Sequence, residues 1–404
     1  MKEHIVAKAW KRNDGRKGIR NKVLIIYTVE CSRHAAVAVA QYFQEKQEDV
    51  DVTGSLACLD NQVVIRRLLK YSIHQNVGAV LVIGHGCEYI RPEKLVSFAK
   101  EHGRIAAYLY LQEDGGTQAV IEKGKRIVQR MLEELQHVPQ CDLYASELII
   151  GAKCGGSDFT SGIAGNALVG EFFDRFVEEG GTAMIEEMGE AVGLKDYLVS
   201  RAADEQAARD ISMTYDKTVE FCRRLGRFSI SPGNFTGGLT TIEEKSMGAV
   251  VKSGSSPIKG ILKIAQSPPR KGFWMLDVIP DYKLEPGFYQ GGDTSGLMDQ
   301  IASDCHLLLF VSGRGHVGGT PIAPVIKITG NPETYQKMKQ DIDIDASGIL
   351  TQQENMETLL LRLEETIGKV CCGEKTCAER NGHREGTLFF NYQHPNKVIP
   401  FCYS

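Results

Sequence analysis

Two patterns of hydrophobic and polar positions alternate along the first third of the chain. Short runs of β-branched and other apolar residues predict buried strands, and segments with an apolar residue every three or four positions predict helices. The strands are expected at residues 22–29, 78–83 and 104–111, and the helices at residues 33–47, 62–75, 92–102 and 117–136. Strands that alternate with helices of this length indicate βαβ units and a parallel sheet.

A second region of the same kind begins after a plausible boundary at residues 138–142. Its strands are expected at residues 148–150, 182–185 and 306–311, and its helices at residues 162–179, 197–224 and 240–252. We therefore predict an α/β fold with two α/β domains, residues 1–140 and 141–404, each with a mainly parallel sheet. Ligands of such sheets bind beyond the carboxyl ends of the strands. We expect the active site there, between the two regions.

The composition narrows the class of protein. With 42% hydrophobic and 24% charged residues, it is typical of a soluble globular protein. The formal net charge of -4 excludes a broad basic field for nucleic acid. No apolar run approaches the roughly 18 residues of a membrane span, and the polar N-terminus is unlike a signal peptide. We expect a cytoplasmic protein with no nucleic-acid or membrane partner.

The chain has eleven cysteines, an odd number that favours reduced thiols over a disulfide framework. Four isolated cysteines are placed at strand ends, namely Cys31, Cys58, Cys87 and Cys154. None has the CxxC spacing of a compact zinc knot. Loops after parallel strands converge at one edge of a sheet, so these thiols can be metal ligands from separate loops. Each one alone can also be a nucleophile or a buried thiol.

Glycine is enriched, with 42 residues in the chain, and glycines cluster in five polar loops. This clustering favours backbone held close to a ligand. In the loop at residues 153–162, a helix opens after Ser157 and Asp158. Its N–H groups suit an anion, although either side chain can simply be an N-cap. Glu186, Glu187 and Glu190 follow the next strand. They can bind a cation, supply a base or be exposed acids at a helix start.

Two further loops carry candidate catalytic groups. Residues 231–246 enter a helix in which Thr240 and Glu243 fit a capping box. Lys245 has no such explanation and can act as a base if desolvated, although a solvated helix lysine is the simpler interpretation. Arg314 suits carboxylate binding, and His316 suits acid–base or metal chemistry.

The two ends of the chain carry weaker signals. Near the N-terminus, Arg20 lies in a basic glycine segment, residues 14–21, that either binds a carboxylate or forms a solvated turn. Near the C-terminus, a small zinc or iron–sulfur site is one interpretation of the cysteines, although their spacing fits no strong pattern. These residues are Cys371, Cys372, Cys377 and Cys402, with His383.

Several of these segments together resemble the altronate/galactarate dehydratase family. The matching strings include DGRKGIRN, GHGCE, KCGGSDFTSGIAGNALVG, SPGNFTGGLTTIEEKSMG and SGRGHVGGTPIAPVIKI. The resemblance implies a divalent-metal-dependent lyase, with iron(II) as the metal and manganese(II) as the second choice. It implies that a 2,3-dihydroxy sugar acid loses water to give a 2-keto-3-deoxy acid. The chain begins at the catalytic region of the family, so a separate small subunit is expected. A homo-oligomer is expected as well.

The chain departs from the family pattern at two positions. No histidine precedes Cys58 in residues 53–57, where the family has an HxxGC-like string. The acidic segment at residues 187–190 replaces a Thr-Pro-Glu-type string. The large subunit of sulfolactate sulfo-lyase is also similar, and it expels sulfite by the same elimination logic. Both departures bear on the substrate, and the first bears on the metal ligands.

These observations give a working assignment of roles. Arg314 and Arg20 would hold the substrate carboxylate, and Lys245 or His316 would act as the base. Further substrate contacts are expected from Ser157, Asp158, Asn234, Thr236 and Thr240, and metal ligands from Cys31, Cys87, Glu88, Cys154 and Glu187. Three alternatives remain open: a sulfite-releasing lyase, a non-catalytic sugar-acid binding protein and a nucleotide-binding enzyme. The absence of a P-loop or GxGxxG motif disfavours the last.

Overall fold

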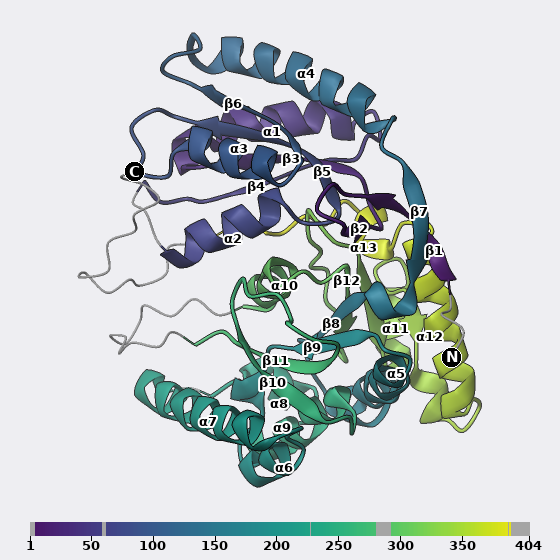
Figure 1. Ribbon diagram of the computed structural model, residues 1–404. Helices are drawn as coiled ribbons and strands as arrows, with labels where there is room; N and C mark the ends of the chain where they lie inside the picture. Colours follow the sequence, from purple (N-terminus) through teal and green to yellow (C-terminus); the bar gives the residue numbers. More distant parts are fainter. Residues whose placement is uncertain (1–4, 59–61, 227, 280–291, 387, 389–404) are drawn as a thin grey trace.

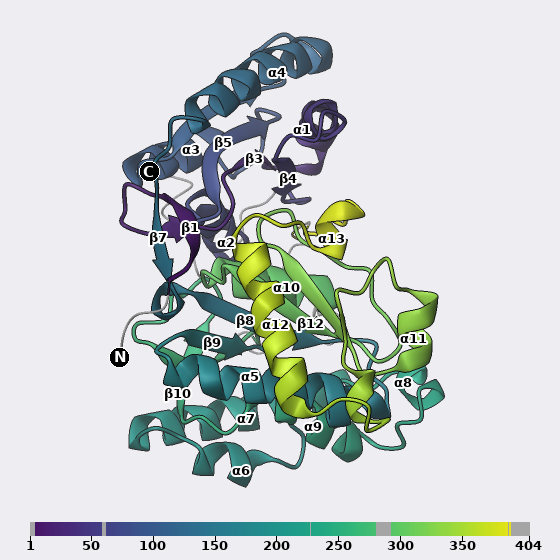
Figure 2. The same ribbon diagram turned by 90° about the vertical axis from the view of Figure 1, so that its right-hand side faces the viewer.

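The computed structural model describes residues 5–58, 62–226, 228–279, 292–386 and 388. The chain forms two parallel sheets, one in each half, and a small antiparallel sheet beside them (Figures 1 and 2). Every strand pair within the two larger sheets is parallel, which confirms the predicted α/β fold with mainly parallel sheets.

The N-terminal sheet has four strands in the order β4-β3-β5-β6. The strands are β3 (Lys22–Tyr27), β4 (Val50–Gly54), β5 (Val77–Gly84) and β6 (Ile105–Tyr110), and the helices are α1 (Glu30–Gln44), α2 (Gln62–Ser72), α3 (Pro92–Glu101) and α4 (Gly116–Leu135). Helices α1 and α4 cover one face, and α2 and α3 cover the other. The hydrophobic pattern did not predict β4, because Asp51 interrupts its apolar run. Asp51 is buried there as the ion-pair partner of Lys22 at 2.5 Å.

The C-terminal sheet has seven strands in the order β10-β11-β9-β8-β12-β13-β14. They are β8 (Ile149–Cys154), β9 (Thr182–Ile185), β10 (Ile258–Lys263), β11 (Gly272–Asp277), β12 (Leu307–Val311), β13 (Val325–Thr329) and β14 (Ile344–Asp345). The α-helices of this half are α5 (Asn166–Glu178), α6 (Lys195–Ser200), α7 (Glu205–Leu225), α8 (Pro232–Thr236), α9 (Ile242–Val250), α10 (Asp293–Ala302), α11 (Pro332–Lys337), α12 (Met356–Cys371) and α13 (Cys377–Arg380). The helix predicted at 197–224 is therefore two helices.

The two halves are joined by a small antiparallel sheet and by a shared core. The small sheet has the order β2-β1-β7 and consists of β1 (Ile5–Lys11), β2 (Lys17–Gly18) and β7 (Gln140–Tyr144). One hydrophobic cluster runs from the α2 and α3 side of the N-terminal sheet to α10 and the C-terminal sheet. A continuous core of this kind fixes the two sheets relative to each other.

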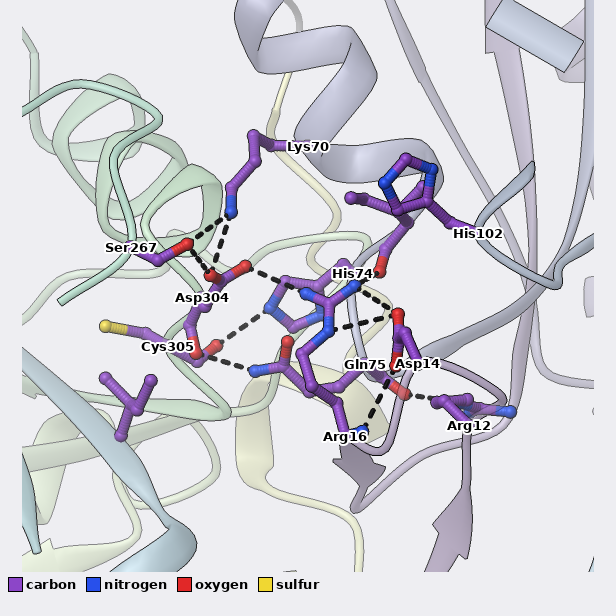
Figure 3. Close-up of polar contacts among 12 residues, drawn as sticks. Arg12, Asp14, Arg16, Lys70, His74, Gln75, His102, Ser267, Asp304 and Cys305 are labelled. Carbon is purple, nitrogen blue, oxygen red and sulfur yellow. Dashed lines mark hydrogen bonds and ion pairs between the residues drawn. The ribbon is translucent and has the colours of Figure 1, made fainter. Parts of the chain in front are cut away.

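A polar junction at the edge of that shared core involves the basic N-terminal motif (Figure 3). Arg16 and Lys70 both pair with the buried Asp304, at 3.2 and 2.8 Å. The side chain of Gln75 donates to the Asp304 carbonyl at 2.6 Å, and a ring nitrogen of His74 lies 3.1 Å from the Cys305 carbonyl. The motif at residues 14–21 therefore fastens the two halves together, a role that the sequence interpretation did not include.

Candidate active site

The site is organised around β8, where the direction of the chain through the C-terminal sheet changes. The chain leaves β8 for β9 on one side and returns to β12 on the other. A crevice forms outside the carboxyl ends of the strands at such a switch point. Here the loops after β8 and β12 lie together, because Gly155 donates to the Val311 carbonyl and Arg314 to the Gly156 carbonyl, at 3.1 and 2.9 Å.

Asp158 holds these loops in place. One carboxylate oxygen accepts from the backbone and side chain of Thr160, at 2.9 and 2.6 Å, and the other accepts from Asn331 at 2.8 Å. A Cβ on Gly313 would lie only 1.9 Å from that carboxylate, so the loop after β12 approaches it as closely as glycine allows. Ser157 and Ser312 are different, because each has a buried hydroxyl without a hydrogen-bond partner. Buried hydroxyls are usually bonded, so these two oxygens are available to a ligand.

A buried network of lysines and glutamates lies beside this crevice. Lys153 contacts Glu186 at 2.6 Å and Glu187 at 3.0 Å. Lys252 contacts the other oxygen of Glu187 at 2.6 Å. Lys245, which the sequence interpretation left between a base and a solvated lysine, is buried and contacts Glu190 at 2.6 Å. Three ammonium groups therefore face three carboxylates inside the protein.

The charges and the burial of this network determine which of its groups carry a proton. Burial opposes the charge on Lys153 and Lys245, but the neighbouring glutamates outweigh burial and raise the pKa of both ammonium groups. Burial likewise opposes ionisation of Glu187, yet Lys153 and Lys252 hold its pKa at about 2. Burial dominates at Glu186 and raises its pKa to about 7. Lys245 is therefore a poor base at neutral pH, since it holds its proton.

His316 and Asp293 extend the network towards solvent. The imidazole stacks on Phe310 with ring centroids 4.5 Å apart, and its Nδ1 accepts from the Gly318 backbone at 2.9 Å. The Nε2 atom lies 3.5 Å from Asp293, whose other oxygen lies 3.6 Å from Lys153. Burial lowers the pKa of His316. The neutral imidazole therefore carries its proton on Nε2 and directs it at Asp293.

Two glycines of the predicted clusters let backbone approach this network. A Cβ on Gly155 would lie 2.3 Å from a carboxylate oxygen of Asp293. A Cβ on Gly296 would lie 2.0 Å from a carboxylate oxygen of Glu186. Real Cβ atoms do not make such contacts, so glycine is required at both positions for the carboxylates to stay where they are.

The group Cys154, Glu187 and Glu190 has a spacing that could hold a metal ion, with ligand atoms within 4.8 Å of one another. The local charge is already balanced, however. Lys252 lies 3.4 Å from the Cys154 sulfur, and burial raises the pKa of that thiol to about 12. The thiol keeps its proton and donates to Glu190 at 3.4 Å. A divalent ion needs a thiolate and free carboxylates, so it would first have to displace an ammonium group.

The other predicted metal ligands lie at the carboxyl edge of the N-terminal sheet. Cys31 and Cys87 are exposed there. The carboxylate of Glu88 is buried and accepts from the Thr28 hydroxyl at 2.6 Å and from the His85 and Gly86 backbone N–H groups at 3.0 and 2.7 Å. Glu88 thus connects the loop after β5 to the end of β3. Both of its carboxylate oxygens are used in these hydrogen bonds, which give it a structural role.

The predicted substrate ligands divide into two sets. Arg20 is buried, makes paired contacts with Glu379 at 2.9 Å and also donates to backbone carbonyls, so its donors are used within the chain. Arg314 is exposed at the crevice, with one donor on the Gly233 carbonyl at 2.6 Å. Asn234 donates to the Ser157 carbonyl at 2.8 Å. Only Arg314 of the two arginines has donors that can reach a ligand at the switch point.

The helix that carries Lys245 begins one residue later than the predicted capping box requires. Thr241 is its N-cap and accepts from the Glu244 backbone at 3.1 Å, whereas Thr240 donates its hydroxyl to the Glu244 carboxylate at 2.7 Å. The predicted pairing of Thr240 with Glu243 is therefore wrong by one position. Thr236, also predicted to contact substrate, is exposed and donates to the Pro232 carbonyl at 3.1 Å.

A cavity of about 530 Å³ opens next to Lys245. Its polar wall includes Ser157 and Asn166, while its rim carries the exposed side chains of Phe159, Ile163 and Met247. The apolar rim does not match a polyhydroxylated acid. The polar side chains around Asp293 suit such a ligand better.

The sequence interpretation assigned no role to Lys153, Lys252 or Asp293. Asp293 follows a glycine pair, and this glycine cluster was the one feature of the sequence that could have indicated a functional role for Asp293. Lys153 stands directly before Cys154, but a lysine inside a strand end gives no pattern of its own. Lys252 lies nine residues after Glu243, in a short 3-10 turn that follows α9, and only the fold brings it to Glu187.

The C-terminal cysteines show no metal site among the residues described. Cys371 and Cys377 are buried and Cys372 is exposed, while Cys402 lies outside the described residues. Within the described part of the chain, no three ligand atoms of this tail come within 4.8 Å of one another. None of the described helices is long and apolar enough to cross a membrane.

Fold and site together define an α/β protein with a buried acid–base network at a sheet switch point. The model of the D-galactarate/altronate dehydratase C-terminal domain matches residues 145–394, and that of the second domain of D-galactarate dehydratase/altronate hydrolase matches residues 9–136. The chain therefore belongs to the galactarate/altronate dehydratase family, as its motifs predicted. The prediction of an enzyme of the hydro-lyase class is confirmed with it.

Three relatives show how far the similarity reaches. The chain is 31% identical to the (2R)-sulfolactate sulfo-lyase subunit beta of Chromohalobacter salexigens, over 95% of this chain and 97% of that one. It is 29% identical to the altronate dehydratase of Bacillus subtilis, over 96% of this chain and 78% of that one. It is 30% identical to the altronate dehydratase of Escherichia coli, over 94% of this chain and 77% of that one.

Proposed function

We propose that the chain is a metal-dependent lyase that removes water from an altronate- or galactarate-like 2,3-dihydroxy sugar acid and yields a 2-keto-3-deoxy acid. The observation that carries this proposal is the buried lysine–glutamate network beside Asp293 and His316. Sugar-acid dehydration needs a base for a weakly acidic proton, cations for the resulting dianion and an acid for the departing hydroxyl. The network contains all three kinds of group within one site.

We assign the base to Asp293 rather than to Lys245 or His316. Lys245 holds its proton, and the Nδ1 lone pair of His316 is occupied by Gly318. Asp293 is the most exposed carboxylate of the network, with about a third of its side chain open to solvent. His316 keeps it in position through Nε2. Lys153, 3.6 Å away, can stabilise the enediolate as a fixed cation. Burial raises the pKa of Glu186 to about 7, so this carboxyl group is the acid that can protonate the hydroxyl as it leaves.

The substrate carboxylate would lie at Arg314, the exposed arginine of the crevice, with Ser157 and Ser312 offering unpartnered hydroxyls to the sugar. Iron(II) is the proposed metal, with manganese(II) as the second choice, and when bound it would polarise the carboxylate or the leaving hydroxyl as a Lewis acid. We also propose a separate small subunit and a homo-oligomer. The steps above use only side chains of this chain.

A sulfite-releasing lyase is the second candidate. It is favoured by the similarity to the sulfolactate sulfo-lyase subunit over 97% of that protein's length. Sulfite leaves as a stable anion without protonation, whereas hydroxide needs an acid. A site with a carboxyl group whose pKa is about 7, Glu186, is therefore better matched to the loss of water.

The test is a turnover screen of the anaerobically purified protein, with and without the product of a neighbouring gene. Altronate, galactarate and sulfolactate are each supplied with iron(II) or manganese(II). Formation of a 2-keto acid without sulfite supports the dehydratase, and release of sulfite from sulfolactate replaces it with the second candidate. Tight binding with no turnover under any condition would leave a non-catalytic sugar-acid binding protein and overturn the lyase.

The variant Asp293→Asn tests the base. Loss of a general base lowers kcat by roughly 10²- to 10⁴-fold. Asp216→Asn is the matched control, because Asp216 is an exposed acid whose ion-pair partner is Lys195 and not a member of the network. His316→Asn should lower kcat less and shift the pH profile, as expected of a positioning residue. Unchanged kcat in Asp293→Asn removes it from the role of base.

A further inference from the structure

Helix α10 carries the proposed base, Asp293, as its first residue and lies very close to the strand β8. A Cβ on Gly296 of α10 would lie 3.2 Å from the ammonium nitrogen of Lys153. A Cβ on Gly151 of β8 would lie only 2.2 Å from the side-chain oxygen of Gln300. Because Asp293 belongs to the same helix, the placement of α10 on β8 sets the 3.6 Å distance from Asp293 to Lys153.

Helix α2 of the N-terminal half holds α10 from across the boundary between the two halves (Figure 1). Arg67 of α2 forms an ion pair with Asp299 of α10, and the two side chains are only 7% and 5% exposed. One turn further along α2, the Tyr71 hydroxyl donates to the Met298 carbonyl at 3.0 Å. Residues one turn apart lie on the same face of a helix. One face of α2 therefore holds two adjacent residues of α10.

Asp299 is close enough to the buried network to affect it electrostatically. Burial raises the pKa of Glu186, and the negative charge of Asp299 adds to this rise. Burial also raises the pKa of Asp299, and the cations Arg67 and Lys153 oppose that rise. Asp299 therefore interacts with two cations, of which Lys153 also serves the proposed acid and base.

We propose that Arg67 is a positioning residue of the active site, which acts through its ion pair with Asp299. The pair fixes α10 on β8 and thereby fixes the position of Asp293. It also neutralises Asp299, which leaves Lys153 to the proposed acid and base. This inference rests on the proposed function, because that function assigns the base to Asp293. Arg67 itself touches none of the reacting atoms.

Loss of the Arg67 guanidinium group would leave the carboxylate of Asp299 buried without its counter-ion. An unpaired buried charge is costly. The cost falls when Asp299 attracts Lys153 or when α10 moves towards solvent, and either change separates Lys153 from Asp293. A misplacement of about 1 Å can lower the rate by about 10²-fold. The proposed carboxylate ligand, Arg314, is not part of this ion pair, so KM should change little.

The experiment compares Arg67→Met with Arg66→Met in the full chain, by steady-state kinetics with galactarate or altronate and iron(II). Arg66 is the matched control, because it is the same residue type at the neighbouring position of α2 and its side chain is exposed. Arg67→Met should lower kcat by about 10- to 10²-fold and leave KM nearly unchanged. Arg66→Met should change neither. Adding Asp299→Asn to Arg67→Met removes the unpaired charge and should recover part of the lost kcat.

Hydrogen–deuterium exchange of the substrate-free protein gives a second readout, which needs no turnover. The backbone amides of α10 should exchange faster in Arg67→Met than in the unmodified chain, and at the unmodified rate in Arg66→Met. Circular dichroism shows whether each variant is folded. If Arg67→Met does not fold, Arg67→Lys takes its place. This variant keeps a cation beside Asp299 and should show the same two effects in a weaker form.

Unchanged kcat or unchanged exchange of α10 in the Arg67 variant would overturn the proposal. Equal losses in the variants of Arg67 and Arg66, or a double variant that recovers no kcat, would overturn it as well. The proposed function fails in a different way. If the unmodified chain turns over no sugar acid while α10 exchanges faster in Arg67→Met, the dehydratase is overturned and the ion pair still positions the helix.

Discussion

Lys252 offers the sharpest test of the buried ion network. Its side chain is 1% exposed and its ammonium group lies 2.6 Å from Glu187, which is itself 4% exposed. Removing one partner of such a pair leaves the other charge unpaired in the interior. This costs about 3–5 kcal/mol, whereas an exposed i,i+4 pair contributes about 0.3–0.5 kcal/mol. Lys252→Met should therefore lower the free energy of unfolding by roughly ten times as much as Lys369→Met, whose partner Glu365 is exposed.

The assay is urea unfolding at neutral pH, followed by tryptophan fluorescence, to which Trp274, buried in β11 of the same sheet, contributes. The double variant Lys252→Met with Glu187→Gln completes a mutant cycle. Its cost should be smaller than the sum of the single variants by about 0.5–3 kcal/mol, the range measured for residues in contact. A loss below about 1 kcal/mol for Lys252→Met, or strict additivity in the cycle, would refute the buried pair.

Three further predictions follow from the same geometry. Gly155→Ala should lower kcat without changing the fold, because its methyl group would displace Asp293 from a position 2.3 Å away; steady-state kinetics and circular dichroism together decide this. Asp304→Asn should destabilise the junction by about 3 kcal/mol. Burial opposes the charge of Asp304, but Lys70 and Arg16 outweigh it and lower the pKa of this carboxylate. Its contribution to the free energy of unfolding is therefore complete above pH 3.8 and is lost as the pH falls through the lowered pKa. Urea unfolding in acid should show this loss of stability in the unmodified protein and not in the variant. Glu186 has the opposite pH dependence, because burial raises its pKa to about 7 and the protonated acid favours the folded state. Its contribution to the free energy of unfolding is complete below pH 4.5 and is lost as the pH rises through about 7. Glu186→Gln should abolish this dependence of stability on pH, as measured by urea unfolding.

The hydrophobic pattern was sufficient for most of the architecture. Apolar runs such as residues 22–29 and 78–83 correspond to the buried strands β3 and β5, because parallel strands covered on both faces consist almost wholly of apolar residues. It failed at β4, where Asp51 and Lys22 neutralise each other inside the core. The sequence alone does not distinguish a charged residue that is buried with an ion-pair partner from a charged residue at the surface.

The chemistry of the candidate site could not be predicted from the sequence. The glycine clusters predicted backbone close to a ligand, and the glycine-rich loops at Gly155 and Gly313 do approach the carboxylates of Asp293 and Asp158 closely. The roles within those loops depended on distances between segments far apart in the chain. Lys245 illustrates the limit, because its residue type suggests a base when buried, and only the 2.6 Å contact with Glu190 shows that it retains its proton.

The charge balance of the network explains why these lysines and glutamates are buried together. An isolated ammonium or carboxylate group in the interior is strongly disfavoured, yet Lys153, Lys252 and Lys245 each have a glutamate within 3 Å. Fixed charges of this kind stabilise a developing dianion without solvent reorganisation, since they are oriented before the substrate arrives. A metal ion in the same place would have to compete with them.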